Sequence, residues 1–307
     1  MMEGRPLCVV VEWFDAQRRA PREFLLKYYR EEGQVEMFEG RRSFLKKSPA
    51  PTELRLSPLG SQVVLYARML KVTAYADDYT KALLGGDGEG EEGCVVATED
   101  FGKHLSEHAD FVDVKLVELN GTELEELNKY VTCHERKVLA IRGKALGNAD
   151  AGLKHLLFER PLARRTARHG NECTCCVIKP HVLLEKRAGD VVGLIEKHFE
   201  ISALRLVTLD GDQANEFLEV YEGVLSDYDK HVEALTLGPC LALEIRGDNV
   251  TTFRDFCGPW DVDFAKELRP DSLRALFGKD NVHNAVHCTD LPEDGDSESR
   301  YFFQLLN

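Results

Sequence analysis

Two stretches of this sequence, 90 residues apart, are nearly the same: residues 114–121 read VKLVELNG, and residues 204–211 read LRLVTLDG. Each runs from alternating apolar positions into a short polar residue and a glycine. This pattern is typical of a strand that ends where a helix begins. The chain is therefore expected to contain two copies of one unit built from strands and helices.

Two further blocks recur in the same order and support the duplication. Residues 94–96 (CVV) match residues 176–178 (CVI), and the triplet IRG occurs at 141–143 and again at 245–247. The copies are unequal, because Gly121 to Gly143 spans 22 positions and Gly211 to Gly247 spans 36. We predict a truncated first copy and a complete second copy, packed together so that surface exposed in a single copy is buried.

The residues before the first copy have a different pattern. Short runs rich in β-branched and aromatic residues predict strands at 9–14, 24–29, 34–38, 61–66 and 69–75. The segment 31–33 (EEG) supplies a glycine for a hairpin between the second and third strands. We therefore expect a small antiparallel β domain.

The predicted domain boundaries follow from these patterns. Residues 85–93 are rich in glycine and acidic residues, a composition typical of a flexible linker. The glycines could also suggest a phosphate-binding loop, but such a loop would end in GK[ST] and would not carry four acidic residues. Residues 160–171 carry four arginines and predict a basic connector between the copies. The expected order is a β domain at 1–84, linker 85–93, truncated copy 94–159, connector 160–171 and complete copy 172–307.

Composition narrows the class of protein. The chain is 43% hydrophobic and 30% charged, which suits domains with apolar cores, and no apolar run reaches the roughly 20 residues of a bilayer crossing. The net charge of −14 argues against nonspecific binding to nucleic acid or to a membrane surface. Nine cysteines, an odd number, indicate reduced thiols, and with no signal-peptide pattern we expect a protein of the cytoplasmic side that is not secreted.

Four side chains of the complete copy suit phosphate chemistry. Lys179 follows a predicted buried strand directly, and Arg254 and Arg274 lie near predicted helix starts or turns. His287 lies in the segment 284–290 (NAVHCTD), among short polar side chains. An imidazole can accept and release a phosphoryl group, and the three cations can hold the charge that spreads over its oxygens.

These residues carry a resemblance to a known family. The segments VIKP (177–180), GP (238–239), SLRALFG (272–278) and NAVH (284–287) resemble the nucleoside diphosphate kinase family, in family order across roughly 172–303. The whole layout is similar to the seventh type of that family, the ciliary and flagellar type with an N-terminal DM-ten domain. The resemblance implies an α+β fold: a pleckstrin-homology-like β domain, then a truncated and a complete ferredoxin-like (βαββαβ) domain.

The resemblance also implies roles for single residues. His287 would be the phosphorylated residue, Glu298 the carboxylate that orients it and Thr289 a supporting hydroxyl. Asn284 would contact the sugar. The nucleotide would be held by Lys179, Arg254, Arg274, Asn284 and Thr289, with Mg²⁺ bound through the nucleotide phosphates if the protein is active, and with no metal-binding residues of its own.

Four positions depart from the family pattern. Leu218 replaces a nucleotide-contacting Tyr, and a base-stacking Phe falls near Asp227 or Tyr228. Trp260 replaces a phosphate-contacting Thr, and Cys288 replaces the Gly after the histidine. In the first copy, Ala97 stands where Lys179 stands in the second, and no histidine motif follows. We therefore expect a lost first site and slow or absent turnover at the second.

The type that the chain resembles implies three functions. The first is a structural component of the ciliary or flagellar axoneme, a microtubule inner protein whose partners are tubulin and other inner proteins of doublet microtubules. The second is an active nucleoside diphosphate kinase that transfers the γ-phosphate of ATP through His287. The third is a factor associated with γ-tubulin at the centrosome. Neither nucleic acid nor a membrane is expected as a partner.

Two further clusters have the composition of metal sites. Cys173, Cys175 and Cys176 form C-x-C-C, but alternate strand residues point to opposite faces and no second Cys or His pair is near, so zinc is not expected. His104 and His108 are spaced to share one helical face, which can bind a metal. The sequence shows no evident third ligand, so an exposed helix face is the expectation there.

Overall fold

The computed structural model describes residues 5–15, 20–51, 62–66, 68–84, 92–144, 146–160, 166–168, 173–246 and 250–306. They form two compact units: Met1–Gly88 with Asp210–Gly238, and Glu89–Leu209 with Pro239–Asn307. The predicted linker lies outside the described residues except for Glu92 and Gly93, which belong to a strand. The predicted connector is described only at residue 160 and at 166–168.

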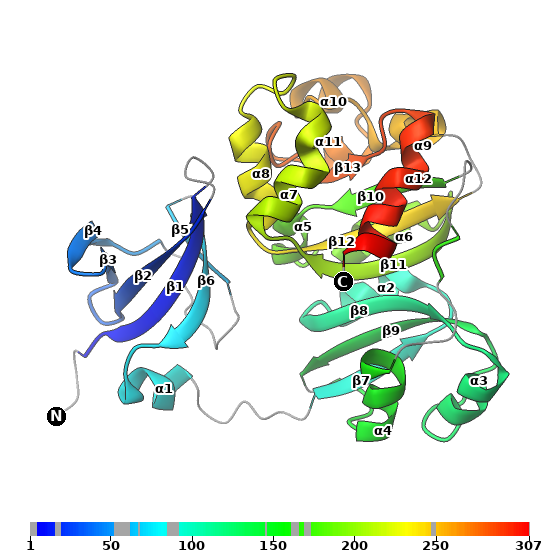
Figure 1. Cartoon of the computed structure of the whole chain (residues 1–307), viewed down its shortest axis with the longest axis horizontal. Helices are drawn as coiled ribbons and strands as arrows, with labels where there is room; N and C mark the ends of the chain where they lie inside the picture. Colours follow the sequence, from blue (N-terminus) through cyan, green and yellow to red (C-terminus); the bar gives the residue numbers. More distant parts are fainter. Residues whose placement is uncertain are drawn as a thin grey trace. The chain divides into compact units, whose positions relative to one another are not determined.

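The first unit is built on a six-stranded antiparallel sheet of order β4-β3-β2-β1-β6-β5 (Figure 1). Gly33, at a φ of +59°, turns the chain between β2 and β3, as the EEG segment predicts. Alternate side chains of the strands form its apolar core. The sheet consists of β1 (Leu7–Asp15), β2 (Ala20–Tyr29), β3 (Gln34–Glu39), β4 (Arg42–Pro49), β5 (Gln62–Leu65) and β6 (Arg68–Tyr75), and α1 (Asp78–Leu84) follows it.

Sequence reasoning finds five of these strands and misses β4 and α1. Residues 42–49 read RSFLKKSP and show no clear alternation, and most of them are exposed. A basic strand at a sheet edge discourages pairing with another chain, so its composition follows its position. The β-rich character of this unit is confirmed.

Two helices from the second copy also group with this unit: α7 (Gly211–Leu218) and α8 (Tyr228–Thr236), joined through the 3₁₀ turn Glu219–Tyr221. The Trp13 indole Nε1 donates a hydrogen bond to Glu233 Oε1 of α8 at 3.0 Å. This grouping differs from the predicted boundaries, which keep α7 and α8 with the rest of residues 172–307.

The second unit is built on a seven-stranded sheet of order β13-β10-β12-β11-β8-β9-β7. Its complete half has the order 4-1-3-2 of a ferredoxin-like fold, and its truncated half has three strands. The truncated copy consists of β7 (Glu92–Ala97), α2 (Phe101–Glu107), β8 (Phe111–Glu118), α3 (Gly121–Leu127), β9 (Lys137–Lys144), α4 (Ala151–Lys154) and the π-helical turn His155–Glu159.

The complete copy adds the fourth strand and more helices. Its elements in this unit are β10 (Cys173–Ile178), α5 (Pro180–Leu184), α6 (Ala188–Ile195), β11 (Glu200–Thr208), β12 (Pro239–Arg246), α9 (Val250–Cys257), α10 (Val262–Leu268), α11 (Leu273–Phe277), β13 (Val286–Cys288), a 3₁₀ turn (Pro292–Asp294), α12 (Gly295–Arg300) and a π-helical turn (Tyr301–Leu305).

The duplication is visible in detail. The three sequence blocks become equivalent strands, and the Asn120-Gly121 and Asp210-Gly211 pairs begin equivalent helices. In both copies the N-cap side chain accepts a hydrogen bond from the third helical residue, whose own side chain accepts one from the cap backbone. The copies join through antiparallel β8 and β11, where Lys115 lies opposite Arg205 (Figure 1).

Helices α2 and α6 pack closely on one another beside this joint. A side chain at Gly102 would place its Cβ 2.3 Å from the Gly193 Cα, so only glycine allows this approach. The Glu196 carboxylate accepts hydrogen bonds from the amides of Phe101 and Gly102, at 2.9 and 3.1 Å. The expected packing of one copy on the other is therefore confirmed.

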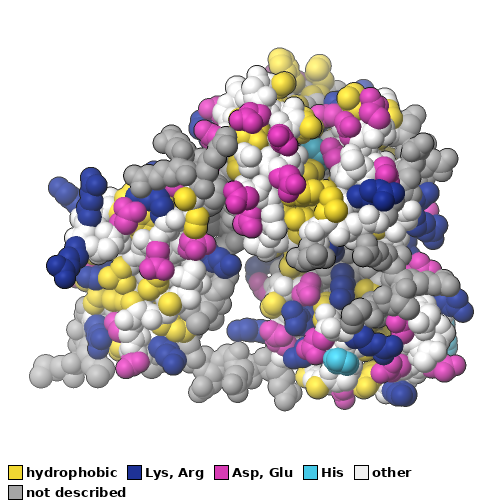
Figure 2. All heavy atoms as spheres, viewed as in Figure 1, with side chains coloured by type: hydrophobic (Ala, Val, Ile, Leu, Met, Phe, Trp, Pro, Cys, Tyr) yellow, Lys and Arg dark blue, Asp and Glu magenta, His cyan; other side chains and the backbone are white. Residues whose placement is uncertain are grey.

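Acidic and basic side chains are interspersed on the face shown in Figure 2. Within the described residues, no helix is both long and apolar enough to cross a bilayer.

Candidate active site

The short strand β13 positions His287. It pairs antiparallel with β10, and His287 lies opposite Val177. Ala285 precedes the strand at a φ of +69°, a conformation that costs a non-glycine residue on the order of 1 kcal/mol, and its carbonyl accepts the Lys179 amide at 2.9 Å. His287 is only 3% exposed. The turn therefore ties the histidine strand to the point where Lys179 leaves β10.

His287 is held by a carboxylate and a hydroxyl. Its Nε2 lies 3.0 Å from Glu298 Oε2, in α12, and Thr289 Oγ1 donates to the same oxygen at 2.9 Å. The Cys175 amide in turn donates to Thr289 Oγ1 at 2.8 Å. Because Nε2 faces Glu298, the candidate nucleophile is Nδ1. The structure brings these three predicted site residues together.

The surroundings of His287 also set its charge. Burial by itself would lower its pKa, but the Glu298 carboxylate more than offsets this, and the pKa is raised above 6.5. A larger fraction of this imidazole is protonated near neutral pH than of an ordinary histidine. Nucleophilic attack by the neutral ring is therefore favoured by pH values above neutral.

Two of the predicted cations are buried beside Trp260. Lys179 and Arg274 are each 4% exposed. Lys179 Nζ donates to the Val282 carbonyl at 2.9 Å and lies 5.5 Å from the centre of the indole. Burial, and then the charge of Arg274, lower the pKa of Lys179 to about 7.

Arg274 is held by main-chain acceptors. Its Nη1 donates to the Gly258 carbonyl at 2.7 Å and its Nη2 to the Val286 carbonyl at 3.2 Å. Its guanidinium carbon lies 5.4 Å from the centre of the Trp260 ring. The indole therefore stacks against both cations, an arrangement stabilised by about 0.5–2 kcal/mol for each contact.

Comparison with known proteins identifies the family. The family model "Nucleoside diphosphate kinase" matches residues 172–307. The chain is 32% identical over 370 residues to the rat protein named nucleoside diphosphate kinase homolog 7 (Rattus norvegicus), covering 97% of this chain and 93% of that protein. It is 33% identical over 368 residues to the mouse (Mus musculus) protein of the same name, with the same coverage. The chain belongs to the nucleoside diphosphate kinase family.

Within that family it is a member of the seventh type, since both of these relatives match along nearly the whole chain. The nucleoside diphosphate kinase of Aquifex aeolicus is 31% identical over 137 residues, which cover 44% of this chain and 96% of that protein. That match has the length of a single kinase domain. The match of the family model to residues 172–307 assigns such a domain to the complete copy.

Arg254, the third predicted cation of this kinase homologue, lies at a more open position. It forms an ion pair with Asp290, and its Nη1 donates to the Asp290 carbonyl at 2.8 Å. It lines a cavity of about 200 Å³ together with Arg274, Trp260 and Arg269. Sequence analysis gave no role to Asp290, although it lies in the quoted segment 284–290, or to Arg269, because their proximity to Arg254 depends on the fold.

Asn284 is fully buried beside the same indole. Its Nδ2 lies 3.4 Å from the Trp260 carbonyl, which accepts its hydrogen bond. Its Oδ1 is buried with no hydrogen-bond partner among the described residues. A buried amide oxygen without a partner is costly, and a donor such as a sugar hydroxyl would satisfy it.

Cys288, which replaces the family's Gly after the histidine, lies on the other side of the strand from His287. Because strand side chains alternate, it points to the face opposite His287 and lies in the apolar core with Cys176 and Cys257. Arg274 Nη2 lies 3.5 Å from its sulfur. The Cys257 thiol and Arg274 hold the pKa of Cys288 below its usual range.

Two of the remaining departures, Leu218 and the Asp227–Tyr228 pair, belong to the first compact unit. Leu218 is buried in α7, and the Tyr228 hydroxyl donates to Asn215 in the α7–α8 pair, in the other compact unit. In the truncated copy, Ala97 is 4% exposed and packs in the core. The position equivalent to Lys179 therefore has no cation in that copy.

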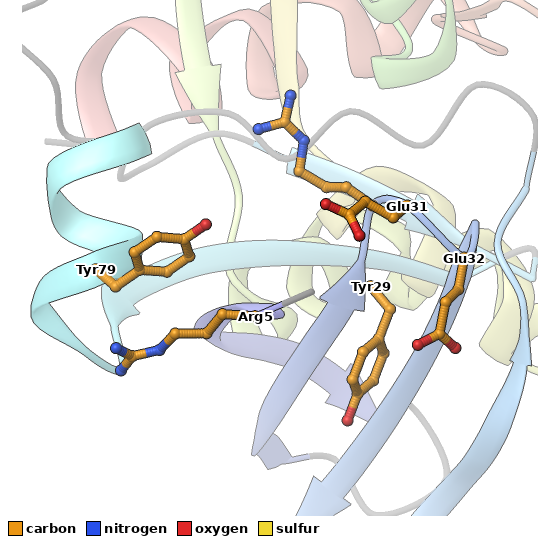
Figure 3. A pocket seen from close by; sticks show the side chains of 6 residues that line it. Arg5, Tyr29, Glu31, Glu32 and Tyr79 are labelled. Carbon is orange, nitrogen blue, oxygen red and sulfur yellow. The ribbon is translucent and has the colours of Figure 1, made fainter. Parts of the chain in front are cut away.

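The first unit contains a hollow of about 400 Å³ between the start of β1, the β2–β3 turn and α1 (Figure 3). Arginines and glutamates line it together with Tyr29 and Tyr79. Arg5 pairs with Asp77 at 3.4 Å, and Tyr29 donates to Glu36 at 2.7 Å. Its charges are mixed and partly paired within the unit, so it selects neither an anion nor a cation.

Proposed function

We propose that this chain is a structural component of the ciliary or flagellar axoneme, an inner protein of doublet microtubules, with at most weak phosphoryl transfer through His287. The observation that carries the proposal is Trp260. Its indole lies against Lys179 and Arg274, and both cations also donate hydrogen bonds to main-chain carbonyls, so a phosphate would compete with contacts that they already make. This arrangement favours a pocket that has lost its primary use.

The organisation of the second unit supports a scaffold role. The truncated copy has no catalytic lysine or histidine motif, and yet it supplies three strands of the continuous sheet. Its retention is explained by the surface that it buries and presents. The resemblance to the ciliary and flagellar type supplies the location and the tubulin partner, and β strands followed by helix α1 support a pleckstrin-homology-like N-terminal domain.

The second candidate is an active nucleoside diphosphate kinase. The bonded set of His287, Glu298 and Thr289 favours it, and Asn284 Oδ1 suits a sugar hydroxyl. The residues around His287 thus fit a nucleotide, whereas the cations under Trp260 fit its phosphates poorly. Mg²⁺ held by those phosphates would neutralise their charge, while Glu298 would hold the imidazole so that Nδ1 faces the phosphorus atom.

A labelling experiment with the full chain separates the two candidates. Purified protein is incubated with Mg²⁺ and radiolabelled ATP, and nucleoside diphosphate is then added. We expect little or no acid-labile label and slow discharge, together with co-sedimentation of the protein with axonemal doublets. The His287→Ala variant should be incorporated into axonemes to the same extent as the unaltered chain. Fast labelling and discharge by a protein that does not associate with doublets would contradict the proposal.

A further inference from the structure

The last turn of α2 carries a cluster of side chains that can ligate a metal. His104 and Glu107 belong to the helix, and His108 is the C-cap residue directly after it, whose amide donates to the His104 carbonyl at 3.1 Å. Glu107 and His108 follow His104 by three and four residues, a spacing that places their side chains near that of His104. Each offers one ligand atom, and these three atoms all lie within 4.8 Å of one another. Glu107 thus supplies the third ligand that was not evident from the sequence.

The hydrogen-bonding state of His104 is a second and independent observation. Its Nδ1 is buried and has no hydrogen-bond partner among the described residues. Glu107 Oε2 is 3.8 Å away, too far for a hydrogen bond. A buried ring nitrogen without a partner carries a desolvation cost that a bound cation would remove.

We propose that His104, Glu107 and His108 bind one divalent transition-metal ion of the zinc class. Two neutral imidazoles and one carboxylate are ligands that Zn²⁺, Co²⁺ and Ni²⁺ prefer, whereas Mg²⁺ and Ca²⁺ favour sets made of oxygen alone. Three protein ligands leave a fourth position for water. The site is separate from His287 and involves neither nucleotide nor phosphoryl transfer.

Other histidines of the unit show what such a site requires. His155 lies 3.2 Å from Glu159 and His283 lies 3.1 Å from Asp280, so both form close pairs with an acid. Neither pair belongs to a group of three ligands among the residues that the structure describes. His155 is therefore a matched control, because it has the same chemistry on a helical turn without the third ligand.

The position of the site predicts a consequence for stability. The helix α2 is short, and its first amides are capped by Glu196 from α6, at the contact that joins the two copies. A metal bound across the last turn would fix the other end of this helix. Because the unfolded chain does not preserve the three-ligand geometry, binding should stabilise the folded second unit.

The test uses the full chain after metal removal with a chelator. We expect one equivalent of Co²⁺ to give the visible absorption bands of a four-coordinate site, and Zn²⁺ to displace it. Zn²⁺ should raise the midpoint of thermal unfolding. His104→Gln, His108→Gln and the exposed Glu107→Gln should each weaken Co²⁺ binding, the histidine variants by about tenfold or more, while His155→Gln should leave it unchanged.

Three results would overturn the assignment. They are the absence of saturable Co²⁺ binding, unchanged affinity in the His104→Gln/His108→Gln double variant, and an intense sulfur-to-cobalt charge-transfer band that assigns the metal to cysteines. Circular dichroism of each variant checks that it folds. Glu107 is exposed, so its substitution tests the ligand set even if a histidine variant is unstable.

Discussion

The indole of Trp260 determines what Lys179 and Arg274 can do. Both cations are buried, and both lie within 6 Å of its ring centre. Each also donates a hydrogen bond to a main-chain carbonyl, Lys179 to that of Val282 and Arg274 to that of Gly258. Lys179 and Arg274 therefore already have partners within the protein.

Replacing this ring should restore phosphate binding. We expect Trp260→Thr to increase the affinity for nucleoside diphosphate and the rate of His287 labelling by about tenfold, since the loss of one or two stacking contacts is worth about 1 kcal/mol or more. Isothermal titration and acid-labile labelling measure both quantities. Phe264→Thr, which removes a 59% exposed ring in α10, is the control and should change neither. Equal behaviour of the two variants would show that Trp260 does not limit the site.

Lys179 should make stability depend on pH. Its pKa is about 7 in the folded chain and 10.5 in the unfolded chain, so between these values the unfolded state binds more protons and folded stability rises with pH. At about 1.4 kcal/mol for each pH unit, the protonation of Lys179 should make the free energy of unfolding about 2–3 kcal/mol higher at pH 9 than at pH 7.

Lys179→Met should remove that dependence. We expect the variant to exceed the unaltered chain in free energy of unfolding most strongly at and below pH 7, and the difference to shrink as pH rises. Chemical denaturation at several pH values measures it. A difference that stays constant across this range would mean that Lys179 is not desolvated as the structure describes.

At the scale of elements, α12 connects the histidine to a buried carboxylate. Glu244, in the middle of β12, is 0% exposed and accepts hydrogen bonds from Ser202 Oγ at 2.6 Å, from the Arg168 amide at 2.8 Å and from Ser299 Oγ. Ser299 is adjacent to Glu298, which holds His287. The two bonds fix the same helix turn to β12 and to β13, the strands on either side of β10.

Ser299→Ala should loosen that turn. The substitution leaves one oxygen of the buried Glu244 carboxylate without this donor, so we expect a loss of about 1–3 kcal/mol in the free energy of unfolding, measured by chemical denaturation. We also expect the raised pKa of His287 to fall, measured by NMR titration. Ser297→Ala, in the same helix, removes only an exposed bond to the Asp294 carbonyl and should cost less than about 0.5 kcal/mol. Similar losses for both serines would contradict this role of Glu244.

At the scale of the whole molecule, the second unit depends on the joint between its two copies. Strands β8 and β11 make one sheet, and the glycine contact between α2 and α6 brings the helices together on one side of it. The truncated copy lacks a fourth strand, but a bridge between Cys94 and Asn148 covers the outer edge of β7. Pairing with β11 on one side and this bridge on the other therefore cover both edges of the three-stranded half of the sheet.

Gly102→Ala should test the joint directly. Its Cβ would lie 2.3 Å from backbone atoms of Gly193, which cannot rotate away, so we expect a loss of about 1–3 kcal/mol in unfolding free energy. Gly121→Ala is the matched control: it begins α3, has nothing within 4 Å, and should be neutral or stabilising by up to about 1 kcal/mol. A tolerated Gly102→Ala would show that the helices do not pack this closely.

Local sequence patterns predicted the duplication, most strands of the two copies and a helix start near Asn120, and the family resemblance singled out His287, Glu298 and Thr289. These are local patterns or motifs, and period-2 alternation could also have placed Cys288 on the face opposite His287. The pairing of β8 with β11, the contact of Trp260 with both cations, the hydrogen bonds of Glu244 to Ser299 and the proximity of Glu107 to His104 and His108 became visible in the folded chain alone. Each of these depends on distances between side chains or strands that the chain order does not fix, because packing brings distant residues into contact.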